Sequence, residues 1–238
     1  MAGILMMALV LVTNNAFGDN AVINNVVGGS VHYNDYVWAT ARNAVDGETL
    51  VDIQLSVYNR FAGTYYVGRE YMNYPISIPV GSEIDSVKIN LTSKIAIGVP
   101  FYMYLVEGIN NTVITLGDFD AFEGRQVSAP HTSTLLADSI QTTGENLEWK
   151  LNEDGVMRIT DAIADTSRLC ILTSSDWSNT PSTSNSFEYY ELNLEGSEAN
   201  MGIWYTPPLA INVRTTLSTG GVVTPFRTES GITPLKRP

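Results

Sequence analysis

The sequence predicts an all-β protein built from antiparallel strands. The first observation is that apolar and polar residues alternate between 84 and 92. In a strand, this alternation places Val87, Ile89 and Leu91 on one face. The second is the placement of turn formers, such as Pro79 and Gly81, between the alternating stretches. The third is that only one stretch has the apolar spacing of a helix. Strands with one buried and one solvent-facing side are typical of antiparallel sheets.

Strands are expected throughout the middle of the chain. Alternation or short apolar runs place them at 50–58, 68–74, 84–92, 100–106, 112–116, 147–151, 168–174, 187–194, 202–205 and 209–213.

The helical candidate is 152–165. Its apolar residues Val156, Ile159 and Ile163 are spaced three and four residues apart, and Asn152 or Asp154 can cap its start. Gly155 weakens this helix, so we expect it to be short.

The composition argues against some classes of protein. Charged residues make up 16% of the 238-residue chain, the net charge is −12 and the pI is near 4.4, so the body is not expected to bind nucleic acid. The single cysteine, Cys170, rules out an intrachain disulfide and is expected in the core. The two histidines, His32 and His131, have no second ligand at metal spacing and are expected on the surface or in loops.

Residues 1–29 are predicted to lie outside the main domain, as an apolar arm and an Asn- and Gly-rich linker over 19–29. The run 4–12 is apolar throughout but is shorter than the roughly 20 residues that cross a bilayer, so no membrane association is expected. Two interpretations stay open. Residues 1–18 are a secretory signal peptide, or they form an arm that is buried in their own domain or in a neighbouring subunit. The arm would make its contacts through Ile4, Leu5, Leu9 and Leu11.

Residues 214–238 are predicted to form an extended basic arm. They contain three prolines, three glycines, four basic residues and one acid, so they carry +3 while the rest of the chain carries −15. Such a segment cannot bury enough of itself to fold alone, and it is expected to pack on its own body or on an identical neighbour. The residues expected in these contacts are Arg214, Phe226, Arg227, Lys236 and Arg237. Residues 30–213 remain as the predicted domain.

No constellation of catalytic residues stands out, so the protein is not expected to be an enzyme and no cofactor is expected. Asp118 and Asp120 form a D-x-D pair, a weak candidate for a cation site that lacks the ligand series of an EF-hand; a solvated loop is the alternative.

Aromatic residues offer the remaining binding chemistry, because a sugar ring can stack on an exposed aromatic ring. The candidates are Trp38, Trp177 and Tyr189. Polar loop residues surround Trp177, so it is expected to be the most exposed of them. The alternative is that these rings pack in the core.

Five segments carry a resemblance to a known family, namely residues 38–43, 66–79, 84–91, 151–155 and 205–213. Together they resemble the DNRLRE-type jelly-roll domain. The middle motif of that family runs Arg, any residue, aromatic, Leu, any residue, Phe, Asp. Arg69, Tyr71, Met72 and Tyr74 match this pattern, while Pro75 stands where Asp is usual, so the role of that Asp does not carry over.

The resemblance covers about 36–213 and implies a jelly-roll-like β-sandwich, found as carbohydrate-binding-like modules of secreted microbial proteins and in structural proteins of phages and archaeal viruses. The expected protein is therefore an antiparallel sandwich with one short helix and two extended arms. The expected function is a structural protein of a virion, as a head decoration, spike or tail component, whose partners are its own copies and other virion proteins. The alternative is a secreted carbohydrate-binding module, with surface glycans as its ligands.

Overall fold

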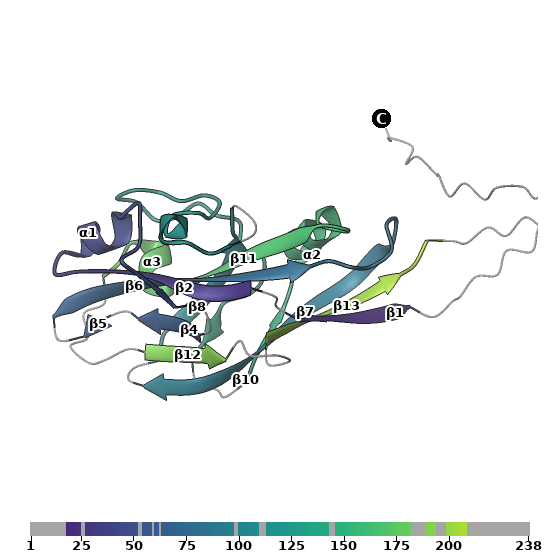
Figure 1. Cartoon of the computed structure of the whole chain (residues 1–238), viewed down its shortest axis with the longest axis horizontal. Helices are drawn as coiled ribbons and strands as arrows, with labels where there is room; N and C mark the ends of the chain where they lie inside the picture. Colours follow the sequence, from purple (N-terminus) through teal and green to yellow (C-terminus); the bar gives the residue numbers. More distant parts are fainter. Residues whose placement is uncertain are drawn as a thin grey trace, which may run out of the picture. The chain divides into compact units, whose positions relative to one another are not determined.

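The computed structural model confirms an all-β sandwich made of two antiparallel sheets (Figure 1). It describes residues 18–24, 27–51, 54–58, 60–61, 63–97, 100–109, 113–142, 146–181, 189–193 and 199–208. The predicted arm residues, in 1–17 and 209–238, lie outside these described residues.

Sheet A has the strand order β1-β13-β7-β12-β4, with β10 paired to β7 as well. Its strands are β1 (Asp19–Asn24), β4 (Gln54–Tyr58), β7 (Glu83–Ile97), β10 (Asn146–Lys150), β12 (Tyr189–Asn193) and β13 (Ala199–Thr206). Sheet B has the order β3-β2-β6-β11-β8-β9, with β5 paired to β6. Its strands are β2 (Val27–Asp35), β3 (Thr49–Val51), β5 (Arg60–Phe61), β6 (Thr64–Pro75), β8 (Tyr102–Glu107), β9 (Ile140–Gln141) and β11 (Thr166–Thr173).

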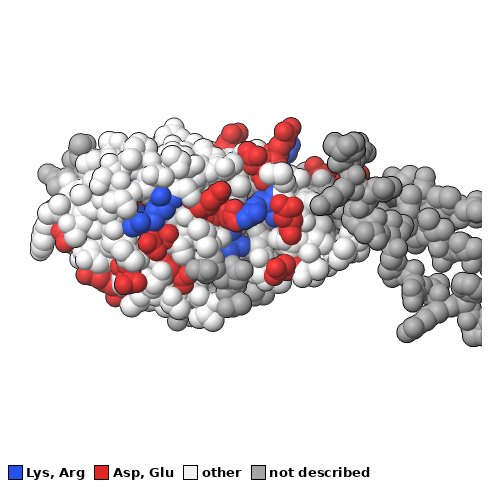
Figure 2. All heavy atoms as spheres, turned by 90° about the horizontal axis from the view of Figure 1, so that it is seen from above, with Lys and Arg blue, Asp and Glu red and all other residues white. Residues whose placement is uncertain are grey.

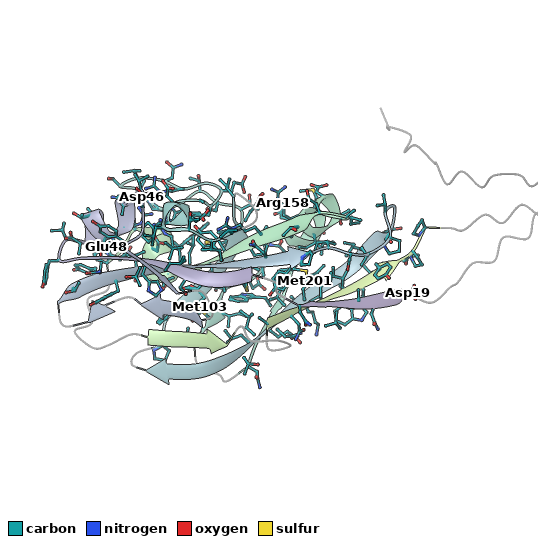
Figure 3. The ribbon with its side chains drawn as sticks, viewed as in Figure 1. Asp19, Asp46, Glu48, Met103, Arg158 and Met201 are labelled. Carbon is teal, nitrogen blue, oxygen red and sulfur yellow. The ribbon has the colours of Figure 1, made fainter. Side chains whose placement is uncertain are left out.

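The main core lies between the two sheets. On β7, Val87, Ile89 and Leu91 point inward, as their alternation predicts, and they pack in one cluster with residues of sheet B. Met103 of sheet B and Met201 of sheet A belong to this cluster, and Figure 3 shows both labelled methionines in the region between the sheets. Each sheet thus buries one face against the other, which is the arrangement of a β-sandwich.

A second apolar cluster covers the other face of sheet B. It contains Val67 and Tyr71 of β6 together with Phe119 and Phe122 from the segment between β8 and β9. As a result, both faces of β6 are covered, and its residues from Val67 to Tyr74 are all buried. The segment between β8 and β9 is therefore a layer that packs on sheet B, and it includes the 3-10 helix η1 (Leu116–Asp118).

Three short α-helices are present in the described residues, where the sequence predicted one. The predicted helix is α2 (Glu153–Asp161), and the side chain of Asn152 caps it by accepting the Gly155 N–H at 2.9 Å. The others are α1 (Trp38–Asn43) and α3 (Ser174–Ser178). Both are about one or two turns long, so neither shows a clear apolar repeat in the sequence.

The N-terminal boundary also differs from the prediction. Residues 19–24, assigned to a linker, form β1, and β2 begins at Val27. Ala21 and Ile23 of β1 point into the core, whereas Asn20, Val22 and Asn24 are exposed. The asparagines that suggested a linker are thus the solvent-facing residues of an edge strand. No helix in the described part of the chain is long and apolar enough to cross a membrane.

Candidate functional site

The outward face of sheet A carries an exposed tryptophan, Trp204. Strand β13 points Met201, Ile203 and Tyr205 into the core, so the residues between them point outward. Trp204 is 40% exposed. A Cβ atom added to Gly202 would lie 3.1 Å from its Cη2 atom, so the indole lies back along the strand over this glycine. The ring therefore packs on the backbone of its own strand and remains partly exposed to solvent.

Polar side chains surround this ring. The strand register places Asn20 of β1 on one side of Trp204 and Ser86 of β7 on the other. Farther along the same face, Lys88 of β7 forms an ion pair with Glu148 of β10 at 2.8 Å, and Asn90 donates a hydrogen bond to Asn200 at 3.1 Å. We call this surface the Trp204 face, and its residues are Asn20, Val22, Ser86, Lys88, Asn90, Glu148, Asn200 and Trp204.

The Trp204 face has the chemistry of a shallow binding surface. An exposed aromatic ring offers an apolar platform, and the side chains beside it supply hydrogen-bond donors and acceptors. Sequence reasoning missed Trp204 because 202–205 was predicted as a strand without assigning its residues to an inward and an outward face. Its position one residue out of phase with Ile203 was the signal that could have revealed it.

The aromatic residues predicted from the sequence do not form a common platform. Trp38, at the start of α1, is half-buried; its Nε1 atom donates to Asn179 at 3.1 Å and its ring packs against Tyr65. Trp177, on α3, is half-buried as well and stacks on Tyr104 at a centroid distance of 5.4 Å. Both lie in the layer over sheet B, whereas Tyr189 belongs to β12 of sheet A.

The two predicted cation ligands have arginine partners. Asp118 accepts a hydrogen bond from Arg168 at 3.1 Å through Oδ1, while its Oδ2 accepts from the backbone and hydroxyl of Thr115. Asp120 lies 3.6 Å from Arg125. The described residues contain no cluster of three His, Cys, Asp or Glu side chains that could hold a metal ion. Asp118 therefore serves to anchor η1 to sheet B through Arg168.

A buried polar cluster fixes the layer over sheet B, and no pattern in the sequence predicted it. Its members are Arg42 of α1, Arg69 of β6, His131 of the connecting segment and Asp176 of α3, all of which are buried. Asp176 accepts hydrogen bonds from Arg69 at 2.8 and 3.1 Å and lies 3.3 Å from Nε of Arg42. These residues are far apart in the sequence, so no local spacing could have predicted the cluster.

His131 is held in one tautomer. Its Nδ1 atom accepts the backbone N–H of Gln126 at 3.0 Å, so Nε2 carries the proton and donates to Asp176 at 3.1 Å. Burial lowers the pKa of His131 and outweighs the opposing effect of Asp176. Both histidines are buried. His131 lies in a connecting segment, as predicted, whereas His32 lies in strand β2 and not on the surface or in a loop, so the prediction for His32 was wrong.

The arginines use their remaining donors on backbone carbonyls. Arg69 donates to Phe119 at 2.7 Å and to Arg42 at 2.8 Å, and Arg42 donates to Gln126 and Ala129. Burial would raise the pKa of Asp176, but Arg69 and the hydrogen bonds from His131 and Arg69 hold it below its usual range. The cluster is thus saturated with internal partners, and its role is to tie α1, α3 and the connecting segment to β6.

Charged side chains elsewhere do not gather by sign on the face that Figure 2 shows. That view looks from above onto the side of the molecule where Figure 1 draws α1 and α2, and acidic and basic side chains lie interspersed on it.

No family model matches the chain, and no curated protein matches it.

Proposed function

We propose that this protein is a structural component of a virion, in a head-decoration, spike or tail role, held by its two terminal segments. The observation that carries the proposal is the pairing of Asp19 with Tyr205, at the start of β1 and near the end of β13. Because these two strands are antiparallel neighbours, the chain enters and leaves the sandwich at the same end (Figure 1).

This arrangement suits a protein that is anchored at one end. Residues 1–17 precede the described sandwich and residues 209–238 follow it, so both attach at the end marked by Asp19 and Thr206. The last 25 residues carry +3, and the rest of the chain carries −15. Opposite charges favour contact between the C-terminal segment of one copy and the body of another. The rest of the sandwich would then be displayed outward.

Truncation tests this proposal. The full chain and a chain that ends at residue 213 are compared by size-exclusion chromatography with light scattering. We expect the full chain to form assemblies larger than a dimer and the truncated chain to lose them. Equal molar masses for the two chains would contradict assembly through the C-terminal segment. The mass of the mature N-terminus adds a second test, since a start at Asp19 favours the secreted alternative.

A second function, glycan binding, is favoured by the Trp204 face. The exposed indole over Gly202 can stack on the C–H face of a pyranose ring, and the flanking Asn20, Ser86 and Lys88 can bond to its hydroxyl groups. Here the binding residue is Trp204, while Trp38 and Trp177 have packing partners inside the protein.

A glycan array probed with the full chain and with Trp204→Ala tests this second function. We expect binding to at least one glycan class, reduced at least tenfold in the variant. Tyr102→Ala is the matched control, because Tyr102 is an exposed aromatic residue on sheet B, 47% exposed, and should leave binding unchanged. Equal binding by wild type and Trp204→Ala would exclude the Trp204 face as the glycan site.

A further inference from the structure

Strand β1 is an edge strand without the usual protection against pairing. In the described residues, β13 is its only neighbour in sheet A. Natural edge strands are commonly kept apart by Lys, Pro, bulges or short length. β1 has six residues, contains none of these residue types, and pairs with β13 without a register shift. The outer strands of sheet B, β3 and β9, have only three and two residues.

The exposed residues of β1 favour pairing with an identical strand. A two-fold axis perpendicular to the sheet keeps each side chain on its own face of the sheet. Two residues that lie opposite each other across this axis must therefore both have even numbers or both have odd numbers. With the axis at Val22, this valine faces its own copy and Asn20 faces Asn24. Val22 is 71% exposed, and a second apolar side chain, Trp204, lies on the same face of the neighbouring strand.

Charge also favours this register. The stretch 20–24 has no charged residue, and Asp19, the only charge on β1, falls outside the paired residues. With the axis moved to Ala21, each Asp19 would instead lie opposite the apolar Ile23. A chain with a net charge of −12 thus has a neutral strand along which it can approach its copy.

We propose that two copies of this protein pair antiparallel along β1, with Val22 of one copy facing Val22 of the other. The two A sheets then join into one continuous sheet, and both Trp204 faces lie on the same side of it. The partner is a second copy, bound through backbone hydrogen bonds and the Val22 contact. This contact lies in the sandwich, so it is separate from the assembly through terminal segments proposed above.

Single-cysteine cross-linking of the full chain tests the register. Directly opposite Cβ atoms lie about 5 Å apart, near the distance a disulfide needs. We therefore expect Val22→Cys to form a covalent dimer on mild oxidation. Asn24→Cys is the matched control, because two copies of residue 24 would lie about 13 Å apart along the strands and should not cross-link. The native Cys170 is fully buried and leaves both experiments with one accessible thiol.

Light scattering and hydrogen exchange complete the test. Truncation after residue 213 should leave the β1 dimer intact, and Val22→Lys in that truncated chain should convert the dimer to a monomer. Backbone amides of β1 should become more protected as protein concentration rises. Protection that does not change with concentration would overturn the proposal: if strong, it would show that the chain's own N-terminal segment covers the edge, and if weak, that the edge is unpaired. Equal cross-linking of Val22→Cys and Asn24→Cys would overturn the register.

Discussion

Arg69 and Asp176 form a bidentate ion pair in which both side chains are fully buried. Nε and Nη2 of Arg69 lie 2.8 and 3.1 Å from the two carboxylate oxygens of Asp176. The pair joins β6, at the centre of sheet B, to the short helix α3. The ring of Phe119 packs against the Arg69 guanidinium at 4.1 Å, which extends the same anchor to the segment between β8 and β9.

Replacement of Asp176 by Asn should therefore destabilise the protein strongly. The variant leaves Arg69 buried without its counter-ion, and removal of one partner of a buried ion pair costs about 3–5 kcal/mol. Urea unfolding followed by fluorescence measures this change. The matched control is Lys88→Gln, which breaks the solvent-exposed pair between Lys88 and Glu148 and should cost less than about 1 kcal/mol. Similar losses in the free energy of unfolding of both variants would mean that the buried cluster does not stabilise the layer over sheet B.

His131 should make stability fall on mild acidification. Its pKa is lowered in the folded protein, mainly by burial, whereas in the unfolded chain it is near 6.5. Below that pH the unfolded state binds more protons, so the free energy of unfolding decreases as pH falls. Because Glu70 titrates with the opposite sign in the same range, the wild type is compared with His131→Gln, which keeps a donor toward Asp176 but cannot titrate. Between about pH 7.5 and about pH 5, the free energy of unfolding of the wild type should fall relative to that of the variant. Equal pH dependence in the two proteins would assign the effect to other groups.

Glu70 should produce the opposite dependence. Glu70 follows Arg69 on β6, so its side chain points to the opposite face of the strand, between the sheets, as that of Met72 does. Burial raises the pKa of Glu70 well above the usual value. In the unfolded chain it ionises near pH 4.3, so above that pH folding stability falls by up to about 1.4 kcal/mol per pH unit until the folded-state pKa is reached.

The variant Glu70→Gln removes this titration. We expect it to match the wild type near pH 4 and to be more stable at pH 8, as measured by urea midpoints at both values. A wild type that stays more stable than Glu70→Gln at pH 8 would show that the carboxylate is ionised and stabilised in the folded protein.

The fold was largely predictable because it depends on local patterns. Alternation in 84–92 identified the inward face of β7, and the spacing of Val156 and Ile159 with Asn152 before them identified α2 and its cap. The candidate sites were harder to predict. To predict that Trp204 is exposed, one must know which residues of its strand face outward. The Arg42–Asp176 contact joins residues 134 positions apart. Such long-range contacts leave no trace in the spacing of a single sequence.

Gly155 gives a final test of how a tertiary contact overrides local propensity. In an isolated helix, Gly→Ala stabilises by about 1 kcal/mol, and on that ground Gly155 weakens α2. In the folded protein, however, a Cβ atom at this position would lie 2.3 Å from the carbonyl oxygen of Leu136, which also accepts the N–H of Asn152. Gly155→Ala should therefore lower the free energy of unfolding by about 1–3 kcal/mol, because the backbone around Leu136 must move away from the helix. Thr160→Ala, at an exposed position of the same helix, should change it by less than about 1 kcal/mol. If Gly155→Ala were as stable as the wild type or more so, the segment around Leu136 would not pack closely on α2.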